Sequence, residues 1–105
     1  MQELKRLYQV YLSYMAEEFP EDTKRDLASE ISFNRFKNGI LQGMLWTVDD
    51  NGNELQINLD AKSCLLVYYV NNKHVKIEKY ASHKDLADVL SGASFDDLLA
   101  SFPEY

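Results

Sequence analysis

Apolar residues recur at helical spacing in the first part of the chain, from Gln2 to Phe19. At about 100° per residue they fall within one broad stripe. The stripe consists of Leu4, Leu7, Tyr8, Tyr11, Leu12, Met15 and Phe19. Val10 and Tyr14 widen it on one flank. This pattern predicts an amphipathic helix that contacts more than one neighbour.

A second helix is expected to begin near Asp22. Pro20 ends the first helix because its ring clashes with the preceding turn, and the segment EDTKRD then supplies capping and acidic residues. Asn38-Gly39 is a stop signal, which leaves the end of the second helix between Ser32 and Asn38. Its buried face would consist of Leu27, Ala28, Ile31 and Phe36.

Beyond Gly39 the apolar residues alternate with polar ones, which predicts strands. Asn51-Gly52 favours a type I′ turn, and such a two-residue loop fixes which residues face each other in the hairpin. In that register Trp46 faces Ile57, and apolar residues meet along one face of the hairpin.

Two further tight turns extend this register. Ala61-Lys62 is expected to form the second turn and Asn71-Asn72 the third, which makes a four-stranded antiparallel meander. Its inner face would carry Met44, Trp46, Val48, Leu55, Ile57, Leu59, Cys64, Leu66, Tyr68, Val70, Val75 and Ile77.

Two short helical segments end the chain. In SHKDLADVL, Ser82 can cap the helix and Asp85 can close a capping box. In SFDDLLASF, Ser94 and Asp97 repeat that arrangement. The apolar faces of the two segments comprise Leu86, Val89, Leu90, Phe95, Leu98, Leu99 and Phe102.

Together these elements predict a single α+β domain over residues 1–105. It would contain two N-terminal helices, the four-stranded antiparallel β-meander and one or two short C-terminal helices. The helices are expected mostly on one face of the sheet.

The composition is that of an ordinary globular protein, with 46% apolar and 27% charged residues among 105. A chain of this length can bury a core without metals or disulfides. The single cysteine, Cys64, cannot form an internal disulfide, and the sequence shows neither a signal-peptide pattern nor the roughly 20 apolar residues that a membrane span needs. We therefore expect a soluble, cytoplasmic protein with no membrane partner.

The charge balance indicates which classes of partner the protein can bind. Eleven Lys and Arg residues against seventeen Asp and Glu residues give a net charge of −6. This charge repels nucleic-acid phosphates, so no nucleic-acid partner is expected. The acidity suits a basic protein partner, although it also fits a general role in solubility.

The stretch TVDDNGNELQINLD, from Thr47 to Asp60, collects carboxylates and amides around one glycine, as a calcium loop does. Aligning Gly52 with the sixth loop position places Thr47 first and Asn58 twelfth, where calcium needs carboxylates. We therefore interpret the stretch as a hairpin turn. The histidines have no partner at metal-ligand spacing, so neither a metal site nor a cofactor is expected.

The sequence shows no catalytic apparatus, and we expect the protein not to be an enzyme. Cys64 is predicted on the inner face, where a thiol behaves as a small apolar group. His74 is predicted on the outer face opposite Tyr69, and His83 in the first turn of a helix. A small enzyme that uses His74 or His83 stays open as a third alternative.

The outer face of the predicted sheet has too many apolar residues for a surface that faces only solvent. Either the chain's own helices cover it, or it is an interface with another copy or another protein. The amphipathic C-terminal segment likewise either docks on a partner or closes the core. The residues predicted for a protein interface are Leu45, Leu65, Val67, Tyr69, His74, Lys76, Glu78, Tyr80, Phe95, Asp96, Asp97, Leu99 and Phe102.

These features favour a small acidic non-enzymatic protein that binds another protein. In class alone, such a helix and antiparallel-sheet protein resembles several groups of bacterial and phage binding proteins, which include secretion chaperones, toxin-immunity proteins and inhibitors of host defence. The resemblance implies an inhibitor, an immunity factor or a chaperone-like adaptor. The alternative is a self-associating structural or scaffold protein, a homodimer formed through the outer sheet face.

Overall fold

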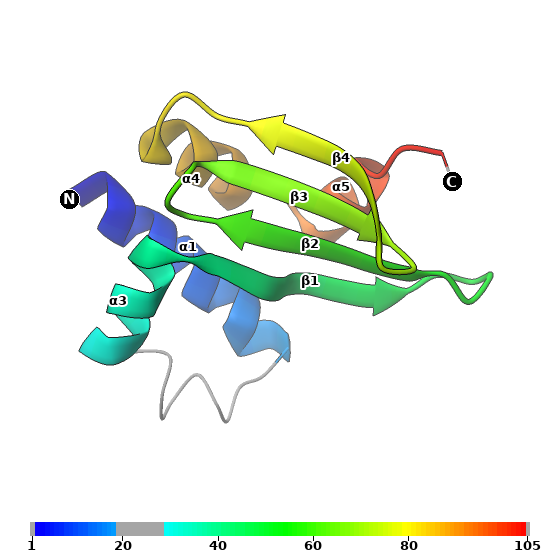
Figure 1. The fold of residues 1–105 in the computed structure, drawn as a ribbon, viewed down its shortest axis with the longest axis horizontal. Coiled ribbons are helices and arrows are strands. Elements are labelled where there is room, and N and C mark those ends of the chain that lie inside the picture. The colour runs from blue at the N-terminus through cyan, green and yellow to red at the C-terminus, as the bar shows by residue number, and fades with distance from the viewer. Residues whose placement is uncertain (1, 19–28, 105) are drawn as a thin grey trace.

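The chain folds into a four-stranded antiparallel sheet with helices before and after it (Figure 1). The structure is a computed structural model that describes residues 2–18 and 29–104. Its elements are α1 (Gln2–Glu18), α3 (Glu30–Asn38), β1 (Ile40–Val48), β2 (Glu54–Asp60), β3 (Leu65–Val70), β4 (Lys73–Lys79), α4 (His83–Gly92) and α5 (Phe95–Ala100). The strands lie in chain order, so the predicted α+β class and the meander are confirmed.

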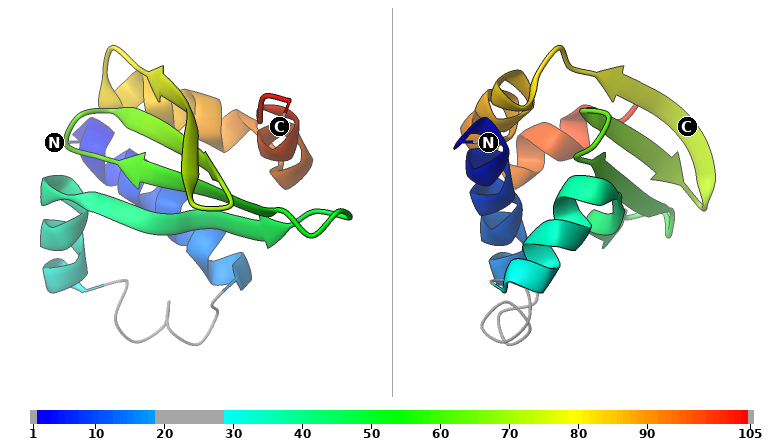
Figure 2. Two further views of the ribbon diagram at one scale, coloured as in Figure 1. Left: turned by 45° about the vertical axis from the view of Figure 1, so that its right-hand side comes forward. Right: turned by 60° about the vertical axis from the view of Figure 1, so that its left-hand side comes forward.

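The helices α1, α4 and α5 lie on one side of the sheet, and α3 lies beside the start of β1 (Figure 2). We call the helix-covered side of the sheet the inner face and the opposite side the outer face. α1 and α4 pack against each other, and Arg6 of α1 forms an ion pair with Asp88 of α4. The prediction that the helices lie mostly on one face is therefore confirmed.

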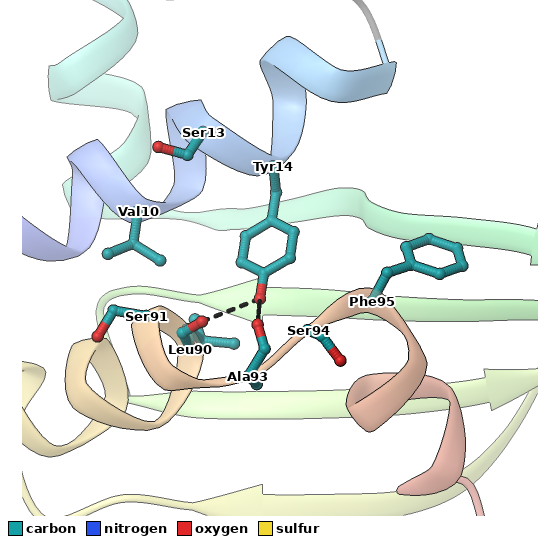
Figure 3. A pocket seen from close by; sticks show the side chains of 8 residues that line it. All are labelled: Val10, Ser13, Tyr14, Leu90, Ser91, Ala93, Ser94 and Phe95. Atoms are coloured by element: carbon teal, nitrogen blue, oxygen red, sulfur yellow. Dashed lines mark hydrogen bonds between the residues drawn. The ribbon is translucent and has the colours of Figure 1, made fainter.

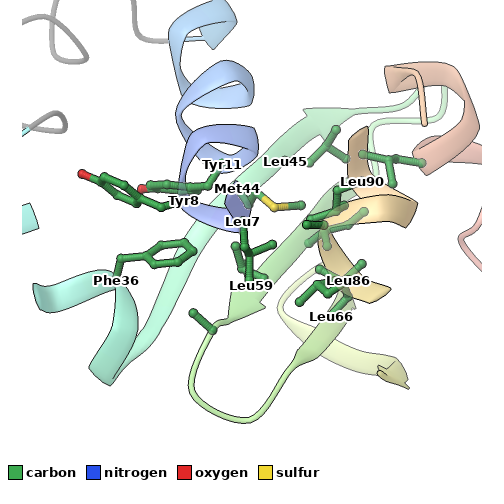
Figure 4. Close-up of a cluster of buried hydrophobic side chains, with 14 of the residues drawn as sticks. Leu7, Tyr8, Tyr11, Phe36, Met44, Leu45, Leu59, Leu66, Leu86 and Leu90 are labelled. Carbon is green, nitrogen blue, oxygen red and sulfur yellow. The ribbon is translucent and has the colours of Figure 1, made fainter. Parts of the chain in front are cut away.

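The core fills the space between α1, α4 and the inner face (Figure 4). Leu7 of α1, Leu59 and Leu66 of the sheet, and Leu86 and Leu90 of α4 each expose 1% of their surface or less. Burying one leucine side chain contributes about 1.5–3 kcal/mol, so this cluster is a main source of stability. The predicted apolar stripe of α1 faces this core from Leu4 to Met15, and its last member, Phe19, lies outside the described residues.

Aromatic rings join α3 to α1. The centroid of the Phe36 ring lies 4.9 Å from that of Tyr8 and 5.3 Å from that of Tyr11. Phe36 is fully buried, as predicted. These contacts hold α3 where it can lead into β1.

The expected helix start near Asp22 lies outside the described residues, as do Leu27 and Ala28. α3 begins at Glu30, after Ser29 Oγ accepts a hydrogen bond from the Ser32 N–H (3.2 Å), and it ends at Asn38, within the predicted interval. Ile31 was expected on the buried face, but it is 67% exposed. Five residues separate it from Phe36, which places the two on nearly opposite sides of the helix.

The first hairpin turn is one residue longer than predicted. The Asp49 N–H donates to Asn53 O (2.9 Å), and the Gly52 N–H donates to Asp49 O (3.1 Å). Gly52 has a φ of 83°, whereas Asn51 does not have a positive φ. The turn is therefore a type I turn followed by a left-handed glycine, rather than type I′.

The extra turn residue moves β1 by one position against β2, so that Leu45 faces Ile57 and Trp46 faces Gln56. A shift of one residue exchanges the two faces of a strand. The predicted register is wrong here. Leu45, expected at the interface, is 1% exposed in the core, whereas Trp46 and Val48, expected inside, are 50% and 49% exposed on the outer face.

A β-bulge interrupts β1 between Leu41 and Leu45. Gly43 lies within it with a φ of 74°, and the Gly43 N–H donates to Asn58 Oδ1 of β2 (3.1 Å). Three residues of β1, 42–44, lie between Leu41 and Leu45 opposite the single residue Asn58 of β2, so the bulge contains two extra residues and breaks the alternation of side chains within it. Met44, buried as predicted, and Leu45 are consequently both in the core.

The second turn has four residues, 61–64, instead of the predicted two, and Cys64 has a φ of 57°. It moves the pairing by two positions, so Ile57 faces Tyr68. A shift of two keeps every side chain on its predicted face. The third turn at Asn71-Asn72 is confirmed, with φ angles of 51° and 66°.

A second irregularity lies in β4. Tyr69 faces His74, as predicted, but Tyr68 faces Lys76, so that Val75 is the extra residue. The pairing beyond Val75 is thus one position away from the predicted register, and this part of β4 has its faces exchanged.

This shift overturns four predicted positions. Ile77, expected on the inner face, is 52% exposed on the outer face. Lys76 and Glu78, expected on the outer face, turn toward the helices because they face the buried Tyr68 and Leu66. Tyr80, also expected outside, packs against the core.

The turns after β1 and β3 are joined by side-chain amides. Asn71 Nδ2 donates to Asn53 Oδ1 (2.9 Å), and Asn71 Oδ1 accepts from the Glu54 N–H (2.9 Å). Asp49 Oδ1 accepts from the Asn53 N–H (2.8 Å), which ties the first turn into the same group. The two hairpin ends are therefore held together.

Both C-terminal helices begin at the predicted capping serines, and of the two predicted capping boxes the one at Ser94 is complete. Ser82 Oγ accepts from the Asp85 N–H (3.2 Å), and Ser94 and Asp97 form a complete capping box. Val89 was expected on the apolar face of α4, but it is 44% exposed.

Candidate functional site

The outer face is the side of the sheet that the described helices leave uncovered (Figure 2). The strand register places thirteen side chains on it. They are Ile40, Trp46, Val48, Glu54, Gln56, Asn58, Asp60, Leu65, Val67, Tyr69, His74, Ile77 and Lys79. Of the residues predicted for an interface, Leu65, Val67, Tyr69 and His74 lie here, but Val67 is buried between its neighbours and exposes only 8% of its surface.

One row of side chains crosses all four strands of this face. Trp46, Gln56, Tyr69 and His74 are successive cross-strand neighbours. The ring centroids of Tyr69 and His74 are 6.1 Å apart in an edge-on arrangement. Aromatic side chains with one polar end are enriched in protein interfaces, and this row supplies three rings.

Apolar side chains flank the row. Val48 lies beside Trp46 on β1, Ile40 lies at the other end of β1, and Ile77 lies on β4; each is about half exposed. Exposed apolar side chains gathered on one face mark a contact surface, whereas single ones do not. Sequence reasoning placed Trp46, Val48 and Ile77 on the wrong face and so missed them.

The amides on the outer face have a structural role. Asn58 is buried, and its Oδ1 accepts hydrogen bonds from the Gly43 N–H and from Gln56 Nε2 (2.7 Å). Gln56, Asn58, Tyr69 and Asn72 border a shallow hollow of about 180 Å³. The amide pair therefore fixes the bulge of β1 and shapes the middle of the face.

A polar cluster lies on the inner side of β4. Glu78 Oε1 is 2.6 Å from Lys76 Nζ, and Glu78 Oε2 accepts a hydrogen bond from the Tyr80 hydroxyl (2.5 Å). Lys76 Nζ also donates to Ser101 O (3.2 Å) and lies 5.2 Å from the centroid of the Tyr68 ring. This cluster fastens the end of α5 to the sheet.

The ionisation of these groups suits a structural role. Burial raises the pKa of Glu78, but hydrogen bonds from Lys76 and Tyr80 outweigh it and leave that pKa below its usual value. Burial, and then the charge of Glu78, raise the pKa of Tyr68 to about 12. Burial and the hydrogen bond to Glu78 also raise the pKa of Tyr80. At neutral pH the carboxylate is therefore charged and both phenols keep their protons.

The apolar side of α5 is occupied by the protein itself. Leu98 is 3% exposed, and Phe95, Leu99 and Phe102 pack against the core. The Phe102 ring meets the Tyr68 ring edge-on at 5.0 Å. The predicted interface residues of this segment thus divide: Phe95, Leu99 and Phe102 close the core, while Asp96 and Asp97 are exposed.

A cleft of about 450 Å³ lies between α1 and the end of α4 (Figure 3). The Tyr14 hydroxyl enters it and lies 2.9 Å from Leu90 O and 2.8 Å from Ala93 O. Its lining is Val10, Ser13, Tyr14, Leu90, Ser91, Ala93, Ser94 and Phe95. Only the width of the apolar stripe, with Val10 and Tyr14 on its flank, pointed to a contact here.

The hydroxyl groups of the cleft bond to the backbone. Ser13 Oγ donates to Gln9 O (3.0 Å), Ser91 Oγ donates to Asp88 O (3.2 Å), and Ser94 Oγ accepts from the Asp97 N–H (3.1 Å). Among the eight lining residues no histidine or carboxylate lies beside a serine to activate it. The cleft is suited to apolar contact.

The two histidines lie in different parts of the molecule. His83 Nε2 lies 2.6 Å from Ala61 O and so joins α4 to the turn after β2. His74 lies on the outer face against Tyr69. Cys64 is buried, and burial, with a smaller effect of the Asp60 charge, raises the pKa of its thiol. Within the described ranges, no three His, Cys, Asp or Glu side chains lie close enough to hold a metal ion.

The suspected calcium loop uses its carboxylate within the turn. Asp49 Oδ1 accepts from the N–H groups of Asn51 (2.9 Å) and Asn53 (2.8 Å), and Asp49 Oδ2 accepts from Asn53 Nδ2 (3.0 Å). Such bonds stabilise a turn and occupy the oxygens that would face an ion. The carboxylate has a structural role in this hairpin.

No helix in the part of the chain that the structure describes has the length and apolar character to cross a membrane. Comparison of the chain with protein-family models, curated proteins and solved structures found no match.

Proposed function

We propose that the protein is a non-enzymatic binding module that contacts another protein through its outer face. The observation that carries the proposal is the one-sided arrangement of the helices, which leaves Trp46, Val48 and Ile77 about half exposed together. A protein of this size gains little by leaving such side chains in water unless a partner covers them.

The charge of the protein indicates which kind of partner it binds. The chain has a net charge of −6, and Glu54 and the exposed Asp50 of the first turn flank the apolar part of the outer face. Acidic residues beside an apolar contact surface speed encounter with a basic partner and improve its orientation. The partner we expect is thus a basic protein, and an inhibitor, an immunity factor or a chaperone-like adaptor in the cytoplasm of a bacterium or a phage-infected cell is the role that fits.

Affinity capture from the source cell tests the proposal. Ile77→Lys would place a charge in the outer face, whereas Val89→Lys makes the same change on α4, at a position 44% exposed on the other side of the molecule. We expect Val89→Lys to retain the partner and Ile77→Lys to reduce its recovery at least about tenfold, as at a central interface position. Equal recovery with both variants would rule out the outer face as the binding surface.

A further inference from the structure

The two edges of the sheet differ in charge. β4 has the sequence KHVKIEK, in which Lys73, Lys76 and Lys79 recur along the strand. β1 has the sequence ILQGMLWTV, with no charged residue among nine. Edge strands expose unpaired backbone groups, and lysines on an edge commonly keep other strands from adding to it. The β4 edge has this protection and the β1 edge does not.

The backbone of β1 presents hydrogen-bonding groups at the edge with which no described strand pairs, and we call this the open edge. The Asp49 N–H donates to Asn53 O, and hydrogen-bonded pairs alternate along an antiparallel ladder. Leu45 and Thr47 therefore point their backbone groups toward β2, and Trp46 and Val48 point theirs away from it. β2 shows the matching alternation, because Glu54 O accepts from Asn71 N on the β3 side (2.8 Å).

Trp46 and Val48 thus offer two kinds of contact at one place. Their side chains are half exposed on the outer face, and their N–H and C=O groups face the open edge. Among the described strands only β2 pairs with β1. A strand added at this edge would satisfy these backbone groups and cover these side chains together.

We propose that a second copy of this chain pairs with β1, antiparallel and with Thr47 opposite Thr47. In this register Trp46 of each copy faces Val48 of the other in a hydrogen-bonded pair, and the two sheets form one continuous sheet. The bulge at Gly43 confines regular pairing to residues 45–49, and Thr47 is the centre of that segment. A twofold axis through Thr47 makes the contact self-complementary.

The charge distribution favours a second copy over a different partner. A chain of net charge −6 repels its own copies, so a self-contact needs an uncharged strand, which β1 is. A basic partner would find no charge on β1 to neutralise. Antiparallel pairing also directs the two acidic turns to opposite ends: Asp50 of each copy would be six positions along the strand from that of the other, roughly 20 Å. That separation is well beyond the Debye length of about 8 Å.

Sedimentation velocity over a series from micromolar to several hundred micromolar tests the inference. Trp46→Lys and Val48→Lys alter the β1 edge, and Ile77→Lys is the matched control on the other edge strand. The three positions are 50%, 49% and 52% exposed. Each change makes the net charge less negative by one, so a loss of association does not come from greater repulsion between the net charges of the two copies.

We expect reversible dimers in the micromolar range for the wild type and for Ile77→Lys, since an interface of one short ladder is small. Trp46→Lys and Val48→Lys should weaken the dimer at least about tenfold. A wild-type monomer throughout the series would overturn the inference. So would a dimer that Ile77→Lys disrupts and Trp46→Lys does not, because that result places the contact on the outer face instead.

A disulfide cross-link gives a second readout that does not depend on the stability of the lysine variants. In a Cys64→Ser background, Thr47→Cys places two thiols opposite each other in a non-hydrogen-bonded pair, whose Cα separation of about 4.5 Å suits a disulfide. Mild oxidation should yield a covalent dimer with Thr47→Cys and none with Ile77→Cys. No cross-link at Thr47 in a soluble dimer would refute the register.

The inference goes beyond the proposed function and can fail separately from it. Ile77→Lys should reduce partner capture and leave the dimer intact. Loss of partner capture therefore tests the proposed function, and loss of the dimer tests the pairing of β1.

Discussion

Lys76 and Glu78, two residues apart on β4, form an ion pair of 2.6 Å on the inner face of the sheet. Because Lys76 also bonds to Ser101 O and Glu78 to the Tyr80 hydroxyl, the pair joins β4 to the end of α5. An ion pair with such additional hydrogen bonds is worth more than an isolated surface pair.

Glu78→Gln should lower the free energy of unfolding by about 1–2 kcal/mol, since it removes a charge from a hydrogen-bonded group while it keeps the size of the side chain. Urea denaturation at neutral pH measures the effect. Glu54→Gln makes the same charge change at an exposed position and should stay within about 0.5 kcal/mol of the wild type. Equal losses in the two variants would show that Glu78 contributes only its charge to the whole molecule.

The same pair predicts a loss of stability in acid. The pKa of Glu78 is lower in the folded protein than in the unfolded chain, where a glutamate titrates at about 4.3. Its contribution is therefore fully present above about pH 4.3 and is lost as the pH falls through the folded pKa. Denaturation of the wild type and Glu78→Gln at several pH values should show a constant difference from neutral pH to about pH 5 and a shrinking difference below that. A difference that grew in acid would contradict the assignment.

Asn58 should matter through the bulge that it holds. Asn58→Ala removes the acceptor of the Gly43 N–H and should cost about 1–3 kcal/mol, the usual penalty for an unsatisfied, partly buried donor. Gln56→Ala removes the other donor to the same oxygen and leaves the bond to Gly43 in place, so it should cost less. Thermal unfolding of the two variants distinguishes them, and a larger loss for Gln56→Ala would show that the bulge does not depend on Asn58.

Leu45 and Trp46 provide a direct test of the register of β1. Leu45→Ala empties part of the core and should cost about 2–5 kcal/mol. Trp46→Ala removes a half-exposed side chain and should cost much less, although tryptophan is the larger residue. Urea denaturation of both variants gives the comparison. The opposite order would restore the register with Trp46 inside.

Local patterns predicted the elements of this fold. The helical stripe of α1, the caps at Ser82 and Ser94, and the turn at Asn71-Asn72 depend on neighbouring residues, and all are confirmed. These features are predictable from the sequence because each capping bond or turn angle involves residues only a few positions apart.

The bulge of β1 depends on a distant partner, and for that reason the sequence could not show it. The Gly43 N–H donates to Asn58 Oδ1, fifteen positions away, and the residues around Gly43 do not predict that hydrogen bond. The type of the first turn likewise depends on Asn51, which tolerates either sign of φ. The longer first turn and the irregularity at Val75 each shifted the pairing by one position, and the bulge of β1 shifted it by two.

These shifts also explain how much of the candidate site was predicted. Tyr69 and His74 lie between the irregular segments and keep their predicted outer face. Leu45, Lys76 and Glu78 lie beyond them and moved inside. The sequence thus predicted a second face rich in apolar residues and left open whether helices cover it, and only the cross-strand pairing identifies the side chains at its edges.

The amide link between the two hairpin ends has a consequence for recognition. Asn71 bonds to both Asn53 and Glu54, so the strands that carry Trp46 and Tyr69 end in one cross-braced unit. A surface held in this way loses little conformational freedom when a partner arrives, and less of the contact energy is spent on ordering it. A rigid surface of this kind can therefore bind a partner tightly through a small contact area.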